Sequence, residues 1–220
     1  VAITDGEQQI MLFSNEGKAV RFAETEVRSM GRAAKGVRGM RVTLAAAQAE
    51  DETDLDVESD DDESTEAGFI SRIVSLVVVP EAGEVLCACA NGYGKRTPVN
   101  VFPTKKRGGK GIIAIKTSER NGELVGAVAI DVTKEVMLIS DGGTLVRTRA
   151  SEIAETGRNA QGVRLIRLGN EEILVGVVSV EAVEDEDEFE HLIQDDSVQN
   201  ETETVDTDVV DAPVENTETE

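Results

Sequence analysis

Arginine and lysine recur at fixed places along this chain, and the chemistry open to them is the binding of phosphate groups. Counted from a glycine that three similar segments share, the position four residues earlier is basic in every segment, as Arg32, Arg107 and Arg158. Such side chains neutralise nucleic-acid phosphates and release counterions without reading the bases. The recurrence therefore predicts a row of phosphate contacts along a bound DNA duplex, one for each segment.

A larger set of cations completes the predicted DNA-binding surface. It adds the position five residues after the shared glycine, positions that are basic in two segments, and the cations of two glycine-containing loops. Any single one of these is equally well explained as the solvent face of a strand, but acidic residues almost never occupy the recurring positions. The predicted contacts are Arg21, Arg32, Lys35, Arg38, Arg41, Lys95, Arg96, Lys105, Lys106, Arg107, Lys110, Lys116, Arg147, Arg149, Arg158, Arg164 and Arg167.

One loop, residues 104–111 (TKKRGGKG), concentrates four cations among glycines. Glycine lets the backbone approach a phosphate oxygen closely, so that N–H donors add to the side-chain charge. The loop lacks the Gly-x-x-x-x-Gly-Lys-Ser/Thr spacing of a nucleotide-binding P-loop. It is therefore predicted to contact a DNA backbone and not a nucleotide.

The net charge of −22 conceals a basic body. Residues 50–66 contain 11 acidic residues and residues 181–220 contain 17, and neither segment has a Lys or Arg. The other 163 residues carry 22 basic and 16 acidic side chains, a net charge of +6. Both acidic segments have the composition of disordered chain. The tail either serves solubility alone or folds back on the cations and competes with DNA.

Several other classes of function lack the residues that they need. Five Phe, one Tyr and no Trp are too few for a platform that stacks single-stranded bases, and the apolar stretches are too short to span a membrane. Cys87 and Cys89 lie two apart on one expected strand, which predicts buried thiols and neither a disulfide nor a zinc site. Tyr93 lies on an expected turn without catalytic partners, and no nucleophile–base pair, metal cluster or cofactor loop is present. No catalytic residue, metal or cofactor is therefore predicted.

The segments that carry the cations are repeats of one structural unit. Residues 10–42 and 136–168 are identical at 14 of 33 positions at a constant offset of 126. A more divergent copy, residues 86–116, aligns between them with a one-residue gap, so that Asn15, Asn91 and Asp141 mark the same turn. A period near 50 residues is typical of propeller-like arrays with one blade per repeat.

Each repeat predicts four short strands and no long helix, so the predicted fold class is all-β. In the third copy the strands are residues 136–140, 144–149, 163–168 and 173–180, which are rich in Val, Ile and Leu and separated by Gly, Asn and Asp turns. The predicted divisions are the end of a preceding blade (1–9), repeats at 10–49, 68–132 and 133–180, a disordered acidic insertion (50–67) and a disordered acidic tail (181–220).

The repeats, the basic loop and the acidic tail together resemble the C-terminal domain of the DNA gyrase A subunit. The resemblance runs through residues 1–180 and is carried by strings such as NGYGKRT, ERNGELVGAV, GTLVRTRASEI and GRNAQGV. It implies a β-pinwheel, a propeller variant whose four-stranded blades exchange strands, with six blades of which this chain would carry the last three. The family's basic box, QRRGGKG, belongs to the first blade; residues 105–111 resemble it but have Lys105 and Lys106 in place of Gln and Arg.

The resemblance also implies function and partners. The family wraps duplex DNA around its outer edge, which lets an ATP-dependent type II topoisomerase introduce negative supercoils in the bacterial cytoplasm, at the nucleoid. ATP, Mg²⁺, the cleaving tyrosine, the second A subunit of an A2B2 complex and the gyrase B subunit would all act through other domains. Two alternatives remain open: the related domain of topoisomerase IV, which guides substrate geometry without strong wrapping, and a propeller that binds proteins through its acidic segments.

Overall fold

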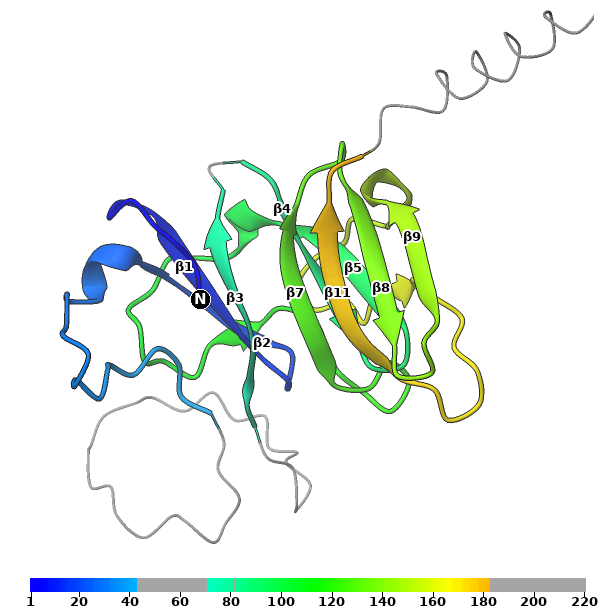
Figure 1. The fold of residues 1–220 in the computed structure, drawn as a ribbon, viewed down its shortest axis with the longest axis horizontal. Coiled ribbons are helices and arrows are strands. Elements are labelled where there is room, and N and C mark those ends of the chain that lie inside the picture. Colours follow the sequence, from blue (N-terminus) through cyan, green and yellow to red (C-terminus); the bar gives the residue numbers. More distant parts are fainter. Residues whose placement is uncertain (43–70, 81, 183–220) are drawn as a thin grey trace, which may run out of the picture. The chain divides into compact units, whose positions relative to one another are not determined.

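The computed structural model describes residues 1–42, 71–80 and 82–182, and its regular structure is almost entirely β-strand, which confirms the all-β prediction (Figure 1). The acidic insertion predicted at residues 50–67, and all but the first two residues of the tail predicted at 181–220, lie outside the described residues. Residues 1–8 contain no strand. The predicted division into repeats and acidic segments stays a prediction.

Three antiparallel sheets account for the strands of the described residues, and their members are not consecutive in sequence. The first sheet has the order β3 (Ile73–Val79), β1 (Gln9–Ser14), β2 (Lys18–Ala23), β6 (Ile112–Ile113). The second has the order β10 (Val163–Arg164), β5 (Tyr93–Pro98), β4 (Glu84–Cys89), β7 (Leu124–Ile130). The third has the order β11 (Leu174–Val180), β8 (Glu135–Ser140), β9 (Leu145–Arg149). A 3-10 turn follows the second strand of each repeat, at Glu24–Glu26, Val99–Val101 and Ala150–Glu152.

The first two sheets are completed by a short strand from the next repeat. β6 belongs in sequence to the second repeat but pairs with β2, with Ala19 opposite Ile112. β10 belongs to the third repeat but pairs with β5, with Gly94 opposite Val163. The third strand predicted at residues 163–168 is therefore shorter than expected. It also lies in the preceding sheet, as the strand exchange implied by the resemblance requires.

The structure corrects the predicted alignment of the middle repeat. The first strands begin at Gln9, Glu84 and Glu135, offsets of 75 and 51 residues, and the ends of the second strands and the 3-10 turns keep the same offsets. The backbone N–H that donates the cross-strand hydrogen bond at the turn belongs to Asn15, Ala90 and Asp141, at N···O distances of 3.0, 2.9 and 3.0 Å. Ala90, not Asn91, is thus the equivalent residue, and the one-residue gap disappears.

The sheets pack face to face through two apolar clusters, with the second sheet between the other two. Strand β4 contributes to both, because side chains alternate across a strand. Val85, Cys87 and Cys89 join the cluster shared with the first sheet, while Leu86 and Ala88 join the cluster shared with the third. Both cysteines are buried free thiols on one face, as predicted, and burial raises the pKa of each thiol to about 12.

A glycine with positive φ brings each exchanged strand against the sheet that it completes. Gly111 and Gly162 have φ values of 81° and 85°. A Cβ at Gly111 would lie 2.8 Å from the carbonyl oxygen of Ala19, and one at Gly162 would overlap the carbonyl oxygen of Gly94. Gly36, the equivalent residue of the first repeat, has the same backbone conformation but no described atom within 4 Å of its would-be Cβ.

This contrast predicts different costs for the same substitution. Gly36→Ala and Gly162→Ala both force alanine into a left-handed conformation, at about 1–2 kcal/mol. Gly162→Ala also drives a methyl group into backbone, which adds about 1–3 kcal/mol. We expect urea unfolding to show the larger loss of stability for Gly162→Ala. Equal losses would show that the close approach of the backbones does not limit the packing.

Candidate nucleic-acid interface

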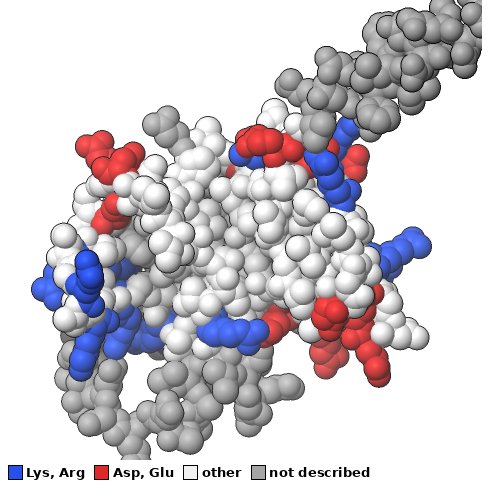
Figure 2. Space-filling model, viewed as in Figure 1, with Lys and Arg blue, Asp and Glu red and all other residues white. Residues whose placement is uncertain are grey.

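The basic loop of the second repeat packs against the loop of the first. The backbone N–H of Gly108 donates to Gly39 at 2.6 Å, and that of Arg41 donates to Gly109 at 2.9 Å. These bonds bring the exposed side chains of Lys105, Lys106 and Lys110 together with the exposed side chains of Arg38 and Arg41. Figure 2 shows Lys and Arg side chains gathered over the segments that follow β2 in Figure 1.

Arg107 and Arg158 occupy equivalent places at the two junctions between sheets. Arg107 donates to the carbonyl oxygen of Arg38 at 3.0 Å, and Arg158 donates to that of Ile113 at 3.2 Å. Arg38 and Ile113 are themselves equivalent, each two residues beyond the shared glycine. Both arginines are half-buried, and both guanidiniums donate to backbone carbonyls. The recurrence in sequence is thus a recurrence in space.

Most of the remaining predicted contacts are exposed. Arg32 and Lys35 lie in the first repeat's loop, and Lys116 follows β6, with its backbone N–H donating to Ala160 of the third repeat at 3.2 Å. Arg149 ends β9, and Arg164 lies on β10. Arg167 is exposed three residues further on. All of these side chains are accessible to a ligand, and their contact with DNA stays a prediction.

Three of the predicted contacts occupy the same structural position, once in each repeat. In the corrected register Arg21, Arg96 and Arg147 are equivalent. Each lies on the second strand of its repeat, opposite the residue ten positions earlier on the first strand of that repeat. Arg21 donates to the carbonyl oxygen of Phe102 at 3.0 Å, and Arg96 donates to that of Ile153 at 2.7 Å. These acceptors follow the 3-10 turn of the next repeat. Arg21 and Arg96 therefore fasten neighbouring repeats. Arg96 is buried, which corrects its predicted role, whereas Arg21 is half-buried and its contact with DNA stays a prediction.

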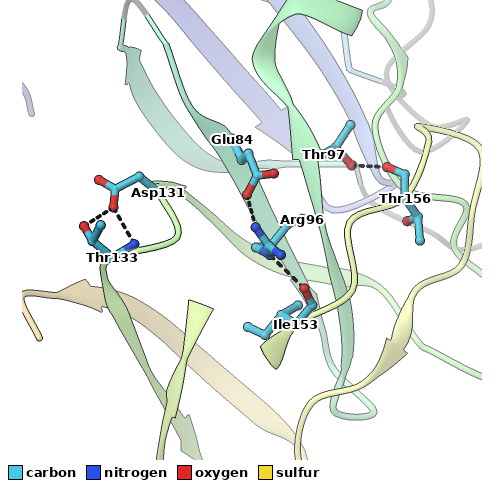
Figure 3. A network of polar contacts seen from close by, with 7 residues as sticks. All are labelled: Glu84, Arg96, Thr97, Asp131, Thr133, Ile153 and Thr156. Atoms are coloured by element: carbon cyan, nitrogen blue, oxygen red, sulfur yellow. Dashed lines mark hydrogen bonds and ion pairs between the residues drawn. The ribbon is translucent and has the colours of Figure 1, made fainter. Parts of the chain in front are cut away.

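Arg96 is the most enclosed of these arginines. It forms an ion pair with Glu84, and the two side chains are only 8% and 12% exposed (Figure 3). Burial raises the pKa of the Glu84 carboxyl, and Arg96 opposes that rise. In the third sheet Arg147 forms the same pair with Glu135, but its side chain is 43% exposed.

Lys95 is also removed from the predicted contacts, because its side chain is fully buried. Its ammonium donates to the carbonyl oxygens of Gly157 and, at 2.9 Å, Arg158. Next to it, Thr97 donates to the carbonyl oxygen of Thr156 at 3.0 Å (Figure 3). Lys95 therefore positions the loop that carries Arg158. Burial lowers the pKa of its ammonium to about 8.

The sequence held signals for both corrections. In the register without a gap, Lys95 aligns with Val20 and Val146, an apolar position of the second strand. Arg96 then aligns with two other arginines, which reveals a position that is basic in all three repeats. Sequence reasoning also missed Arg120, an exposed residue of the turn before β7. Nothing in the repeat marks it, because it has no basic counterpart in the other copies.

The residues that the structure describes offer neither a metal-ligating cluster nor a membrane-spanning helix. No group of three or more metal-ligating side chains occurs among them. None of their helices has the length and apolar character needed to cross a membrane.

Comparison with known protein families identifies relatives of the chain. Residues 8–46, 83–131 and 134–181 match the family described as DNA gyrase C-terminal domain, beta-propeller. The chain is 50% identical over 200 residues to the DNA gyrase A subunit of Haemophilus influenzae, which covers 90% of this chain and 22% of the relative. It is 47% identical over 188 residues to that of Escherichia coli, covering 85% of this chain and 19% of the relative. The chain thus spans about a fifth of these relatives.

Solved structures give the same fold. A DNA gyrase A C-terminal domain superposes with a TM-score of 0.64 at 26% identity, covering 80% of this chain and 52% of the other. A DNA topoisomerase IV C-terminal domain superposes with a TM-score of 0.65 at 20% identity, covering 90% and 54%. The fold alone therefore does not separate the two classes, whereas the sequence relatives named above are gyrase subunits.

The buried arginine predicts a measurable difference between equivalent positions. Arg96→Met leaves Glu84 buried without its partner, so we expect a loss of about 3–5 kcal/mol in the free energy of unfolding. Arg147→Met, its exposed counterpart, should cost less than about 1 kcal/mol. Urea unfolding of both variants checks this. Similar losses would contradict the assignment of Arg96 as a fastener between repeats.

The buried lysine predicts a pH dependence of stability. Because the pKa of Lys95 falls from 10.5 to about 8 on folding, the unfolded chain binds more protons between these values. Stability of the wild type should therefore rise with pH from 8 towards 10.5, relative to Lys95→Met, by about 2–3 kcal/mol in total. The buried thiols act in the opposite direction above pH 9 in both proteins, because burial raises their pKa in each. Parallel stability curves would contradict the prediction.

Proposed function

This chain belongs to the family of DNA gyrase C-terminal domains, and we propose that it binds duplex DNA along the cations of its sheet junctions and wraps it. The equivalent placement of Arg107 and Arg158 at successive junctions supports this proposal most strongly. Cations that recur once per sheet fit a ligand that is itself repetitive. The phosphate backbone of DNA has that property, and contacts to it carry no sequence information.

The energetics of bending explain why many contacts are needed. Bending a few tens of base pairs costs on the order of several kcal/mol. Each exposed Lys or Arg that neutralises a phosphate releases counterions and offsets part of this cost. The loop of residues 104–111 supplies Lys105, Lys106 and Lys110 at one junction, and Arg38 and Arg41 lie beside them. Wrapping is therefore a collective property of several loops.

The wider role follows from the family. We propose that the chain serves a bacterial DNA gyrase, supporting ATP-dependent negative supercoiling in the cytoplasm, at the nucleoid. A second A subunit, the B subunit, Mg²⁺ and ATP would act through other parts of that enzyme. We also propose that the tail, residues 181–220, regulates this binding, because its 17 acidic residues would compete with phosphates for the same cations.

Salt titration of DNA binding tests the proposal. Mixed-sequence duplexes should bind the full chain with little sequence preference and with a steep negative slope of log K against log salt concentration. The triple variant Lys105→Gln, Lys106→Gln, Lys110→Gln should flatten that slope by up to about 2.7 if each ammonium neutralises one phosphate. Lys134→Gln is a matched control, because Lys134 already pairs with Glu181 at 3.0 Å.

The outcome is decisive in either direction. A slope that is flat in the wild type, or a strong preference for one sequence, would contradict wrapping through phosphates. A triple variant with the slope of the control would remove this loop from the interface.

A further inference from the structure

Tyr93 holds two arginine side chains that take part in no ion pair among the described residues. The guanidinium carbons of Arg120 and Arg164 lie 4.7 and 5.4 Å from the centre of its ring. Arg164 also donates to the Tyr93 hydroxyl at 2.9 Å. Contacts of a guanidinium with an aromatic face are attractive and restrict its motion. The ring therefore presents two positive charges at one place on the surface.

The backbone holds both arginines in place beside the Tyr93 ring. Arg164 lies directly opposite Tyr93 in the pairing of β10 with β5, so the strand exchange itself brings the two side chains together. Arg120 lies in a turn built around the buried side chain of Asn121, which donates to the carbonyl oxygens of Lys116 at 2.9 Å and Gln161 at 3.1 Å. A ligand would find this arrangement already formed.

The cluster is also joined to the loop that carries Arg158. Arg120 donates to the side chain of Gln161 at 3.4 Å, and Gln161 lies three residues beyond Arg158. The two arginines on Tyr93 thus belong to the junction between the second and third sheets. They extend the basic surface there with a position that the repeat does not encode.

The charge of the cluster is not compensated within the described residues. Among the described residues Arg72 pairs with Glu123, and Arg147 pairs with Glu135. Arg120 and Arg164 have no carboxylate partner among these residues. Hydrogen bonds from Arg164 and Arg120 lower the pKa of the Tyr93 phenol, which reflects the positive potential at the ring. An anion placed between the guanidiniums would relieve their repulsion and accept from two planar donor groups.

We propose that Arg120 and Arg164, held on Tyr93, bind a single backbone phosphate of the duplex that crosses this junction. The inference rests on the proposed function and adds Tyr93 and Arg120 to it. The ligand chemistry is a phosphate oxyanion, which matches the forked donors of two guanidiniums. A free phosphate ion has the same chemistry, so the test must distinguish the two sources.

A shared phosphate makes a specific prediction for single and double variants. Arg120→Gln and Arg164→Gln should each weaken DNA binding about tenfold at low salt. Because a shared site neutralises one phosphate, the salt slope should flatten by at most about 0.9, in the double variant as in either single variant. Two independent phosphates would instead give a change of about 1.8 in the double variant, which would overturn the shared site.

The ring supplies a second comparison with a conservative variant. Tyr93→Phe keeps the aromatic face and should bind DNA within about twofold of the wild type. Tyr93→Leu removes the face and should resemble Arg120→Gln. Arg72→Gln is the matched control for charge, because Arg72 is already paired with Glu123, and it should leave the slope unchanged. Equal binding by Tyr93→Phe and Tyr93→Leu would overturn the role of the ring.

Tyr93 can report on the site directly, because the chain has one Tyr and no Trp. Its fluorescence should change on addition of duplex DNA, saturate with binding, and lose that response in Arg120→Gln. Inorganic phosphate at the same phosphate concentration should produce no such change. An equal response to inorganic phosphate would assign a free-anion site instead.

DNA binding by the wild type separates the phosphate site from the proposed function. If the wild type binds duplex DNA with a steep salt slope while the Arg120 and Tyr93 variants and the fluorescence remain unchanged, only the phosphate site is wrong. If the wild type itself shows no salt-dependent binding, the proposed function fails first.

Discussion

The close approach of two backbones at Gly111 and Gly162 is the constraint on which the other features of this protein depend. At each of these glycines a short strand leaves its own repeat and completes the sheet before it. Only a residue without a Cβ fits, since the carbonyl of the receiving strand occupies the space where a side chain would begin. The exchange ties each sheet to its successor through main-chain hydrogen bonds, whose geometry does not depend on the surrounding side chains.

This exchange also decides which cations can serve a ligand. Loops on either side of an exchanged strand are brought next to each other, so basic residues from successive repeats meet at every junction. Cations near the sheet edge make hydrogen bonds within the protein. Arg96 donates to a carbonyl of the next repeat, and Lys95 donates to the carbonyls of residues 157 and 158. Those further out, such as Lys105 and Arg41, stay in solvent. Burial, not sequence position, separates the two groups.

Composition and periodicity were sufficient to predict the all-β class, the repeats and the two buried thiols, because these follow from local alternation and self-similarity. The alignment of the middle repeat was harder, since Ala90 replaces the polar residue seen at Asn15 and Asp141 while Asn91 beside it imitates one. That single displacement hid the equivalence of Arg21, Arg96 and Arg147. The exposure of a given cation and the pairing of Arg120 with Tyr93 depend on contacts between distant segments, which no local pattern encodes.

The offset between the unit of sequence and the unit of architecture bears on how such a domain can grow. Each of the first two sheets takes its last strand from the following repeat. Tandem duplication of one whole repeat therefore reproduces an existing junction between repeats, including its glycine and the arginine bond to the neighbouring carbonyl. New blades then need no new interface chemistry. Excision is similarly tolerant of where the cut falls, provided that a full period is removed. Lengthening the array by duplication thus requires fewer changes than altering any one junction between repeats.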